Sequence, residues 1–203
     1  MTSLPDLALD ALHGRFVSGR RIATLARQIA DLLPASATVL DVGCGPGTLT
    51  SRIAALRPDC TFRGIDVMLR PDAVIPVDLY DGQHFPFGDA SVDAVLFVDV
   101  LHHTDDPSVL LREARRVARQ CVIIKDHRRN GLVAGLRLRV MDWVGNAHHG
   151  VRLPYNYLSE KEWRAAFDAA GLKPEVWRQR LGIHSALLDP LVGRDLHFLA
   201  RLT

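Results

Sequence analysis

The feature that most constrains the fold is a short apolar strand pattern that runs directly into a glycine turn. Residues Thr38–Val42 are mainly apolar and β-branched, and Gly43, Gly45 and Gly47 follow at once. Glycine adopts positive φ without a Cβ clash, so a turn of this kind lets the backbone approach a ligand closely. Open parallel sheets bind their ligands beyond the carboxyl ends of the strands. The pattern therefore predicts a ligand site at this turn.

The rest of the chain alternates between strand-like and helix-like patterns. Helices are predicted over Arg15–Leu33, Leu49–Leu56, Asp106–Ala118 and Ser159–Ala170. Strands are predicted over Thr61–Val67, Val74–Val77, Val92–Val98, Cys121–Lys125, Glu175–Arg180 and Leu196–Leu202. Such alternation, with continuous apolar strands, favours an α/β fold whose parallel sheet is covered by helices on both faces.

The length of 203 residues and the absence of a low-complexity linker or internal repeat favour a single domain over residues 1–203. Within it, residues 1–34 are expected to form an N-terminal helical cover. Residues 130–157, which mix apolar, aromatic and basic side chains, are expected to be an insertion on the substrate side.

The charge and the cysteines of the chain limit which partners and which cellular compartment are expected. The net charge is only +2 and the basic residues are dispersed, so a nucleic-acid partner is not expected. Cys44, Cys60 and Cys121 are far apart and give no zinc-binding spacing, which favours a reducing compartment. The first ten residues lack the pattern of a signal peptide, and no apolar run is long enough to span a membrane. We expect a cytoplasmic monomer or homodimer without stable membrane insertion.

Two acidic residues indicate the kind of ligand. Thr48 stands where a dinucleotide-binding fingerprint would place its third glycine. Asp41, just before the glycines, would repel a pyrophosphate but suit the cationic amino-acid end of S-adenosylmethionine. Asp66, at the end of the second predicted strand, is placed to accept hydrogen bonds from ribose hydroxyls. These residues oppose an NAD-dependent oxidoreductase.

Four segments together resemble class I S-adenosylmethionine-dependent methyltransferases, in the branch that contains ubiquinone/menaquinone-type enzymes. The segments are Val39–Gly47, Ile65–Asp66, Tyr80–Phe87 and Ser91–Pro107, the last with its Leu101-His102-His103 turn. The resemblance covers Thr38 to about Lys125. It implies a Rossmann-like, seven-stranded, mostly parallel sheet with an antiparallel last strand.

The resemblance also implies which residues contact the donor. Gly43, Gly45 and Gly47 would bring the backbone close to the methionine part, with Asp41 near its ammonium group. Asp66 would bind the ribose, and Asp81 the adenine amino group, with Asp78 as the alternative to Asp81. Asp99 and Leu101 would line the sulfonium. The neighbouring residues assigned to the same donor site are Cys44, Pro46, Val67 and Gly82.

Methyl transfer from a sulfonium mainly requires alignment of the acceptor, and a base is needed only if the acceptor loses a proton. Histidine suits that task near neutral pH. His102 and His103 follow the fourth predicted strand, and we expect at least one of them to pack under the turn. Asp126 beside His127, after the fifth strand, is the preferred base, because an adjacent carboxylate can orient an imidazole.

Acceptor contacts are expected in the predicted insertion, where aromatic rings with polar ends are typical of a small-molecule pocket. Arg20, in the N-terminal helix, is a candidate anchor for an acidic acceptor. The candidates in the insertion are Trp143, His148, His149, Tyr155 and Tyr157. Adjacent histidines do not converge on one ion, so no metal is expected there.

The sequence thus predicts methyl transfer from S-adenosylmethionine to a small-molecule acceptor, with S-adenosylhomocysteine as product. The acceptor is a hydrophobic molecule or a natural-product intermediate if the apolar series around Leu136 and Leu138 lines its pocket. The alternative is a cyclase or decarboxylase that binds the same donor on the same fold without transferring the methyl group.

Overall fold

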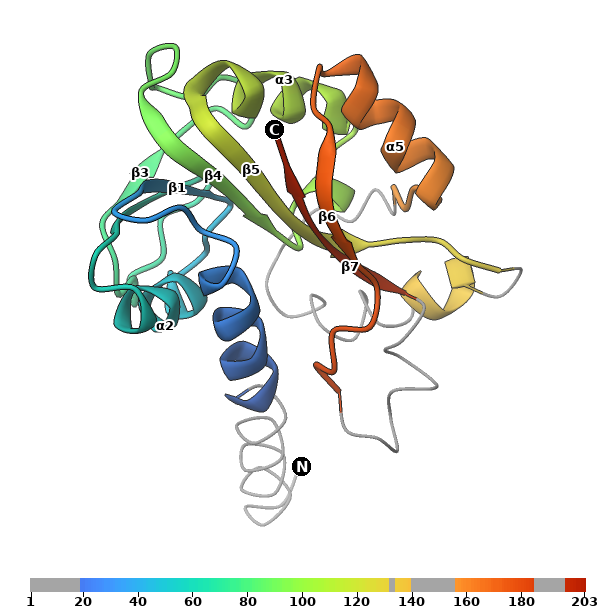
Figure 1. Ribbon diagram of the computed structural model, residues 1–203, viewed down its shortest axis with the longest axis horizontal. Helices are drawn as coiled ribbons and strands as arrows, with labels where there is room; N and C mark the ends of the chain where they lie inside the picture. The colour runs from blue at the N-terminus through green and yellow to red at the C-terminus, as the bar shows by residue number, and fades with distance from the viewer. Residues whose placement is uncertain (1–18, 132–133, 140–155, 185–195) are drawn as a thin grey trace, which may run out of the picture.

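Seven strands form one sheet in the computed structural model, which describes residues 19–131, 134–139, 156–184 and 196–203 (Figure 1). The strands follow one another across the sheet in the order β3-β2-β1-β4-β5-β7-β6. Their bounds are β1 Thr38–Val42, β2 Thr61–Asp66, β3 Val77–Leu79, β4 Val92–Val98, β5 Ala118–His127, β6 Pro174–Arg178 and β7 His197–Leu202.

The direction of the strands confirms the predicted fold class. β1 pairs in parallel with both β2 and β4, and β4 pairs in parallel with β5. β7 lies antiparallel to β5 on one side and to β6 on the other. The strand order reverses at β1, so the carboxyl ends of β1, β2 and β4 meet at the point where such sheets bind ligands.

Helices cover the sheet on both faces, as Figure 1 shows. α3 (Pro107–Val117) and α5 (Glu160–Ala169) lie on one face, where Trp163 and Phe167 are fully buried against the strands. α2 (Thr48–Leu56) and the helical residues 19–30 lie on the other face and contribute Ile53 and Ile29 to a second core cluster. Each helix buries its apolar side and leaves its polar side in solvent.

The ends of two helices are fixed by the caps that the sequence predicts. The side chain of Asp106 accepts a hydrogen bond from the backbone N–H of Ser108, ahead of α3. Ser159 and Glu162 form a reciprocal capping box at the start of α5. These bonds satisfy backbone donors that a helix N-terminus would otherwise leave unpaired.

Several strands differ from their predicted bounds, and two of the differences affect the site. β3 begins at Val77 instead of Val74, because its backbone pairs with β2 from Gly64 to Asp66. β5 runs to His127 instead of ending at Lys125, since its last residues pair with β7, with His127 opposite His197. Polar residues at the end of a strand have low β propensity, so the sequence does not indicate this extension of β5. The backbone hydrogen bonds to β7 keep Asp126 and His127 in the extended conformation.

A membrane-crossing helix would need a long apolar stretch. Across the described parts of the chain, no helix has that length and character.

Candidate active site

The turn after β1 is closely packed by residues from two other strand connections. Gly43, Gly45 and Gly47 all adopt positive φ, between 56° and 77°. A Cβ on Gly47 would lie 2.3 Å from Cγ1 of Ile75, and one on Gly43 would lie 2.7 Å from Cγ2 of Val100. Both distances are far below van der Waals contact, so glycine is required at these two positions for space as well as for backbone conformation.

Cys44 and Pro46 complete the turn. The Cys44 sulfur faces Gly64, where an added Cβ would lie only 2.4 Å from it. Burial raises the pKa of the Cys44 thiol to about 12, so it remains protonated at neutral pH. The Pro46 carbonyl accepts a hydrogen bond of 2.8 Å from the backbone N–H of Val74. Both residues shape the loop, and their contact with the donor stays a prediction.

Asp66 lies at the end of β2 and reaches back to the glycine turn. One carboxylate oxygen accepts from the Gly45 N–H at 2.8 Å, and the other accepts from the Met68 N–H at 3.0 Å. Each carboxylate oxygen has a further lone pair, so the group can still accept two hydroxyl donors. Asp66 also lines the cavity described next, which is the position that ribose binding requires.

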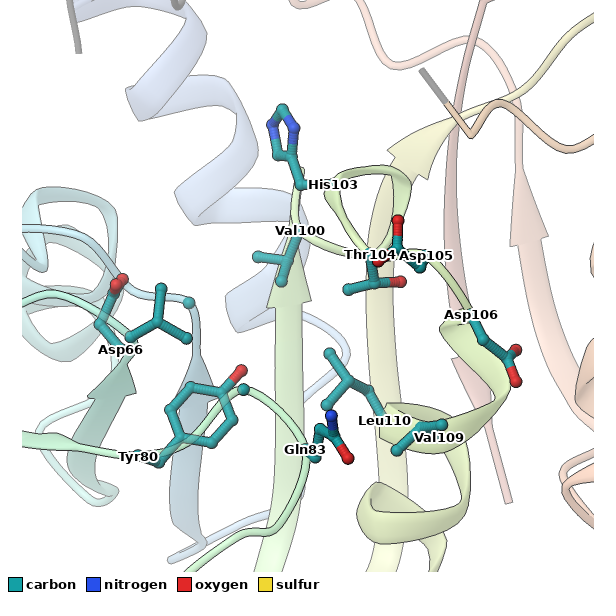
Figure 2. Close-up of a pocket in the computed structure, with 13 residues that line it drawn as sticks. Asp66, Tyr80, Gln83, Val100, His103, Thr104, Asp105, Asp106, Val109 and Leu110 are labelled. Carbon is teal, nitrogen blue, oxygen red and sulfur yellow. The ribbon is translucent and has the colours of Figure 1, made fainter. Parts of the chain in front are cut away.

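A cavity of about 370 Å³ opens beyond the carboxyl ends of β1, β2 and β4 (Figure 2). Its lining includes four residues that the sequence assigned to the donor, namely Gly43, Asp66, Val67 and Gly82. In Figure 2, Asp66 and Tyr80 lie on one side of the cavity and Thr104, Asp105 and Asp106 on the other. The described lining contains three aspartates and no lysine or arginine. Such a cavity favours a cationic ligand.

Asp41 is buried behind the glycine turn instead of lining this cavity. The Thr50 hydroxyl donates a hydrogen bond to its carboxylate. Burial nevertheless raises the pKa of Asp41 to about 7. Asp41 is therefore not the fixed negative charge that the sequence predicts, because it is only partly ionised near neutral pH. A nearby ammonium group would favour its ionised form.

The raised pKa of Asp41 predicts a pH-dependent stability. Asp41 has a pKa of about 7 in the folded protein, against about 3.9 in an unfolded chain. The folded state therefore retains a proton that the unfolded state releases, and stability falls as the pH rises from about 4 to about 7. In Asp41→Asn this contribution should vanish, a difference on the order of 2–4 kcal/mol between about pH 4 and pH 8. Urea unfolding at both pH values measures it, and parallel pH curves for the two proteins would refute it.

Asp81 stabilises a turn beside the cavity. Its side chain accepts from the backbone N–H groups of Gln83 and His84, at 2.8 and 2.7 Å, and pairs with the His84 ring at 2.9 Å. The His84 N–H contributes most to lowering the pKa of Asp81 to about 2. The turn places Gly82 and Gln83 in the cavity lining, while Asp81 itself is outside it. Its predicted contact with adenine stays a prediction.

Asp99 and Leu101, predicted near the sulfonium, have other contacts in the structure. Asp99 adopts φ 57° after β4 and forms ion pairs with Lys125 and with Arg21, the latter at 2.6 Å. Burial would raise the pKa of Asp99, but these two cations outweigh it and hold the pKa well below its usual value. The Leu101 side chain is fully buried in the core. Neither residue lines the cavity in this structure.

The structure pairs Asp126 with His102 and not with its neighbour His127. Nδ1 of His102 lies 2.6 Å from an oxygen of Asp126, whereas Nδ1 of His127 is 3.7 Å from the same oxygen. Burial would raise the pKa of Asp126, but the charge of His102 and its hydrogen bond outweigh it, so the pKa is lowered and Asp126 stays ionised. The other oxygen of Asp126 accepts from the Leu101 N–H at 3.0 Å.

Burial also changes the role predicted for His127. It lowers the pKa of His127 to about 4, so this imidazole is neutral at physiological pH and a weaker base than an ordinary histidine. His102 is buried under the turn after β4, as expected of one of the two histidines there. His103 packs on the His102 ring with 4.0 Å between centroids, and it lines the cavity.

Three further rings, those of Tyr157, His197 and His184, lie next to these histidines. The ring of Tyr157 stacks on His102 at 5.7 Å, and the Tyr157 hydroxyl donates to the Leu138 carbonyl at 3.2 Å. His197 lies 4.7 Å from the His127 ring and is itself within 3.4 Å of His184, measured between the two Nε2 atoms. No sequence pattern indicates His197, because it is the antiparallel pairing of β7 with β5 that brings it opposite His127.

Two sets of these side chains have ligand-type atoms close enough to share a metal ion. They are Asp99 with His127 and His197, and His102 with Asp126 and His127, each within 4.8 Å. The Asp99 carboxylate already lies against the Lys125 ammonium and the Arg21 guanidinium, and two positive charges oppose a divalent cation at that oxygen. In the second set, the His102–Asp126 contact of 2.6 Å is a hydrogen-bond distance, too short for two ligands of one ion.

Most acceptor candidates from the sequence lie outside the described residues. These are Trp143, His148, His149 and Tyr155. Arg20 is described and exposed, on the helical residues 19–30. Its neighbour Arg21 is the one that reaches the site, through the ion pair with Asp99. Of the two acceptor candidates within the described residues, Tyr157 is the one that lies against the histidines.

An open α/β sheet whose cavity lies beyond the ends of β1, β2 and β4 is a Rossmann-like, nucleoside-binding architecture. Residues 13–175 match the sequence profile of a family described as a methyltransferase domain. This match extends over more than half of the chain. The protein therefore belongs to the methyltransferase-domain family, with S-adenosylmethionine as its cofactor.

Two curated enzymes are similar in sequence. The 2-methyl-6-phytyl-1,4-hydroquinone methyltransferase of Synechocystis is 29% identical over 148 residues, which are 68% of this chain and 41% of that protein. The 27-O-demethylrifamycin SV methyltransferase of Amycolatopsis mediterranei is 30% identical over 110 residues, 47% of this chain and 40% of that protein. The chain thus spans about two fifths of the length of these relatives.

Solved structures share the fold at low sequence identity. A Haloferax volcanii methyltransferase complex with an activator protein gives a TM-score of 0.68 at 16% identity, covering 94% of this chain and 93% of the other. The [4+2]-cyclase SpnF gives a TM-score of 0.64 at 16% identity, covering 89% and 80%. A methyltransferase and a cyclase therefore share this architecture, and the fold alone does not distinguish the two activities.

Proposed function

We propose that the protein transfers the methyl group of S-adenosylmethionine to a small-molecule acceptor. The observation that carries the proposal is the acidic cavity of about 370 Å³ that begins at Gly43 and contains Asp66. Its size suits a nucleoside with an amino-acid side arm, and its aspartates suit a ligand with a sulfonium and an ammonium group. The donor supplies an activated methyl carbon when it is bound.

The donor would lie along the cavity between the glycine turn and the turn after β4. Asp66 would accept from the ribose hydroxyls, and Val67 and Gly82 would contact the adenine end. Gly43, at the first turn, would allow the backbone close to the methionine part, because no Cβ intervenes. Asp41 lies behind this turn and would act on the ammonium group through its charge.

His103 is the residue that we assign as base for an acceptor that carries a proton. It lines the cavity and is the last residue of η1 (Leu101–His103), the turn that follows β4. With the donor bound, His103 would accept the proton that the acceptor loses as it takes up the methyl group, and S-adenosylhomocysteine would be the leaving product. His102, held by Asp126, would position that imidazole through the contact between their rings.

The acceptor is proposed to be a small molecule because the two curated relatives are named for a quinol and a rifamycin. The dispersed charge of the chain supports the same class over a nucleic acid. We also propose that the protein is a cytoplasmic monomer or homodimer. Residues 1–34 would cover the donor, and residues 130–157 would lie on the acceptor side.

The competing function is a reaction that binds the donor without consuming it, as the shared fold of the cyclase SpnF illustrates. Incubation with S-adenosylmethionine and a panel of quinols, phenols and macrolactones, with detection of S-adenosylhomocysteine, separates the two. Acceptor-dependent formation of S-adenosylhomocysteine supports methyl transfer. Conversion of a panel member to an isomer, with the donor unchanged, would replace it by the cyclase function.

A further inference from the structure

A second cavity lies on the other side of the histidine group and has the opposite charge. It measures about 280 Å³ and is lined by Arg129, Gly135, Leu136, Arg139 and Tyr157. The described lining holds two guanidinium groups and no carboxylate, whereas the described lining of the donor cavity holds three aspartates and one histidine but no lysine or arginine. Cavities of opposite charge select ligands of opposite charge.

We infer that this second cavity binds an anionic group, a carboxylate or a phosphate, of the methyl acceptor. The inference rests on the proposed function, because it assigns the cavity to the acceptor of that reaction. A guanidinium group binds either anion through two parallel hydrogen bonds, which fixes orientation as well as position.

The position of Tyr157 connects the cavity to the reaction. Tyr157 forms part of its wall, and the Tyr157 ring stacks on His102 at 5.7 Å. His102 in turn contacts His103, with 4.0 Å between the ring centroids and 42° between the ring planes, and His103 lines the donor cavity. A chain of three rings in contact therefore joins the walls of the two cavities. An acceptor anchored at Arg129 and Arg139 would extend along this chain toward the methyl group.

Arg129 retains the capacity to bind such a ligand. Its guanidinium approaches Glu162 at 3.3 and 3.5 Å, which is longer than a strong charge-assisted hydrogen bond. Glu162 makes its shorter contact, 2.7 Å, with the backbone N–H of Ser159 in the capping box. Both side chains of the Arg129–Glu162 pair are about half exposed, at 50% and 49%. An exposed pair of this kind contributes little energy, so exchange for a ligand anion costs little.

The wall of the cavity also has an apolar part. Leu136 is 69% exposed, an unusual state for a leucine, and it stands beside Gly135 and Arg139 in the lining. Gly135 leaves room for the stem of Arg129, whose Cδ is 3.9 Å from the position of a Cβ. Cations beside an exposed leucine suit an acceptor with an apolar body and an anionic group.

The test uses the full chain saturated with S-adenosylhomocysteine and titrated calorimetrically with pyrophosphate, phosphate and benzoate. We expect at least one probe to bind, with affinity lowered about tenfold in Arg129→Gln and in Arg139→Gln, the loss of about one charge-assisted contact each. Arg52→Gln, which replaces an exposed arginine on α2, should bind the probe as the natural chain does. Preference for pyrophosphate assigns a phosphorylated acceptor and preference for benzoate a carboxylic acid; either supports the inference.

Equal probe affinity in Arg129→Gln, Arg139→Gln and Arg52→Gln would overturn the inference that the second cavity binds an anionic group. The absence of binding by all three probes would overturn it as well. The affinity for S-adenosylhomocysteine, measured in the same preparations, distinguishes a failure of this inference from a failure of the proposed function. Intact donor-site binding without anion binding refutes the acceptor cavity alone. Loss of S-adenosylhomocysteine binding by the natural chain refutes the proposed function.

Discussion

His103→Ala should lower the rate of methyl transfer by roughly 10²–10⁴-fold, with a much smaller effect on donor affinity. His103 is the histidine in the described lining of the cavity, and it is the last residue of η1, which follows β4. Without its imidazole, the acceptor proton has no positioned base. The loss should be greatest for acceptors that react only after deprotonation, and the acidic limb of the pH–rate profile should disappear.

Steady-state kinetics from about pH 5 to pH 9 measure this effect, with His84→Ala as the matched control. His84 is a surface histidine, 76% exposed, outside the cavity lining. Asp126→Asn tests the positioning of His103 through His102, and it should move the acidic limb while the protein keeps its donor affinity. A rate for His103→Ala equal to that of His84→Ala would remove His103 from the mechanism.

Gly47→Ala should lower the free energy of unfolding by on the order of 2–5 kcal/mol. Part of this is the cost of a left-handed residue with a Cβ, roughly 1–2 kcal/mol, since Gly47 has φ 77°. The other part is overpacking, roughly 1–3 kcal/mol, because the new Cβ would lie 2.3 Å from Ile75. Urea unfolding compares it with Gly45→Ala, which has φ 56° but nothing within 4 Å of its Cβ.

This pair of variants separates strain from crowding. Gly45→Ala should show the backbone cost alone, so Gly47→Ala should be the less stable of the two. Equal stability of the two variants would mean that Ile75 does not press on the turn, and the shape of the donor cavity would need to be revised.

The sequence predicts the fold well because its signals are local. The strand before Gly43, the cap at Asp106 and the capping box at Ser159 each follow from a few neighbouring residues. The donor side of the site is equally local, since Gly43 and Asp66 stand at the ends of two adjacent parallel strands. Their positions follow once the strand order is known.

The acceptor side depends on contacts between distant residues, which one sequence does not encode visibly. Asp126 precedes His127, so it was natural to pair them, yet the structure pairs Asp126 with His102. His102 comes from the turn after β4 and meets the end of β5, where its Nδ1 lies 2.6 Å from Asp126 and 3.5 Å from Nδ1 of His127. The ion pairs of Asp99 with Lys125 and Arg21, and the approach of His197 to His127, likewise require the folded sheet.

The most direct test of the donor site is a calorimetric titration with S-adenosylhomocysteine. We predict one site per chain, with affinity lowered about 10–100-fold in Asp66→Ala, a loss of about 1–3 kcal/mol from charge-assisted hydrogen bonds. Asp78→Ala, an aspartate on the adjacent strand β3 that pairs with Arg63, is the control and should bind normally. Thermal unfolding of both variants checks that they fold. Equal affinity in Asp66→Ala and Asp78→Ala, or binding of NADH in place of S-adenosylhomocysteine, would contradict the assignment of the cavity to the methyl donor.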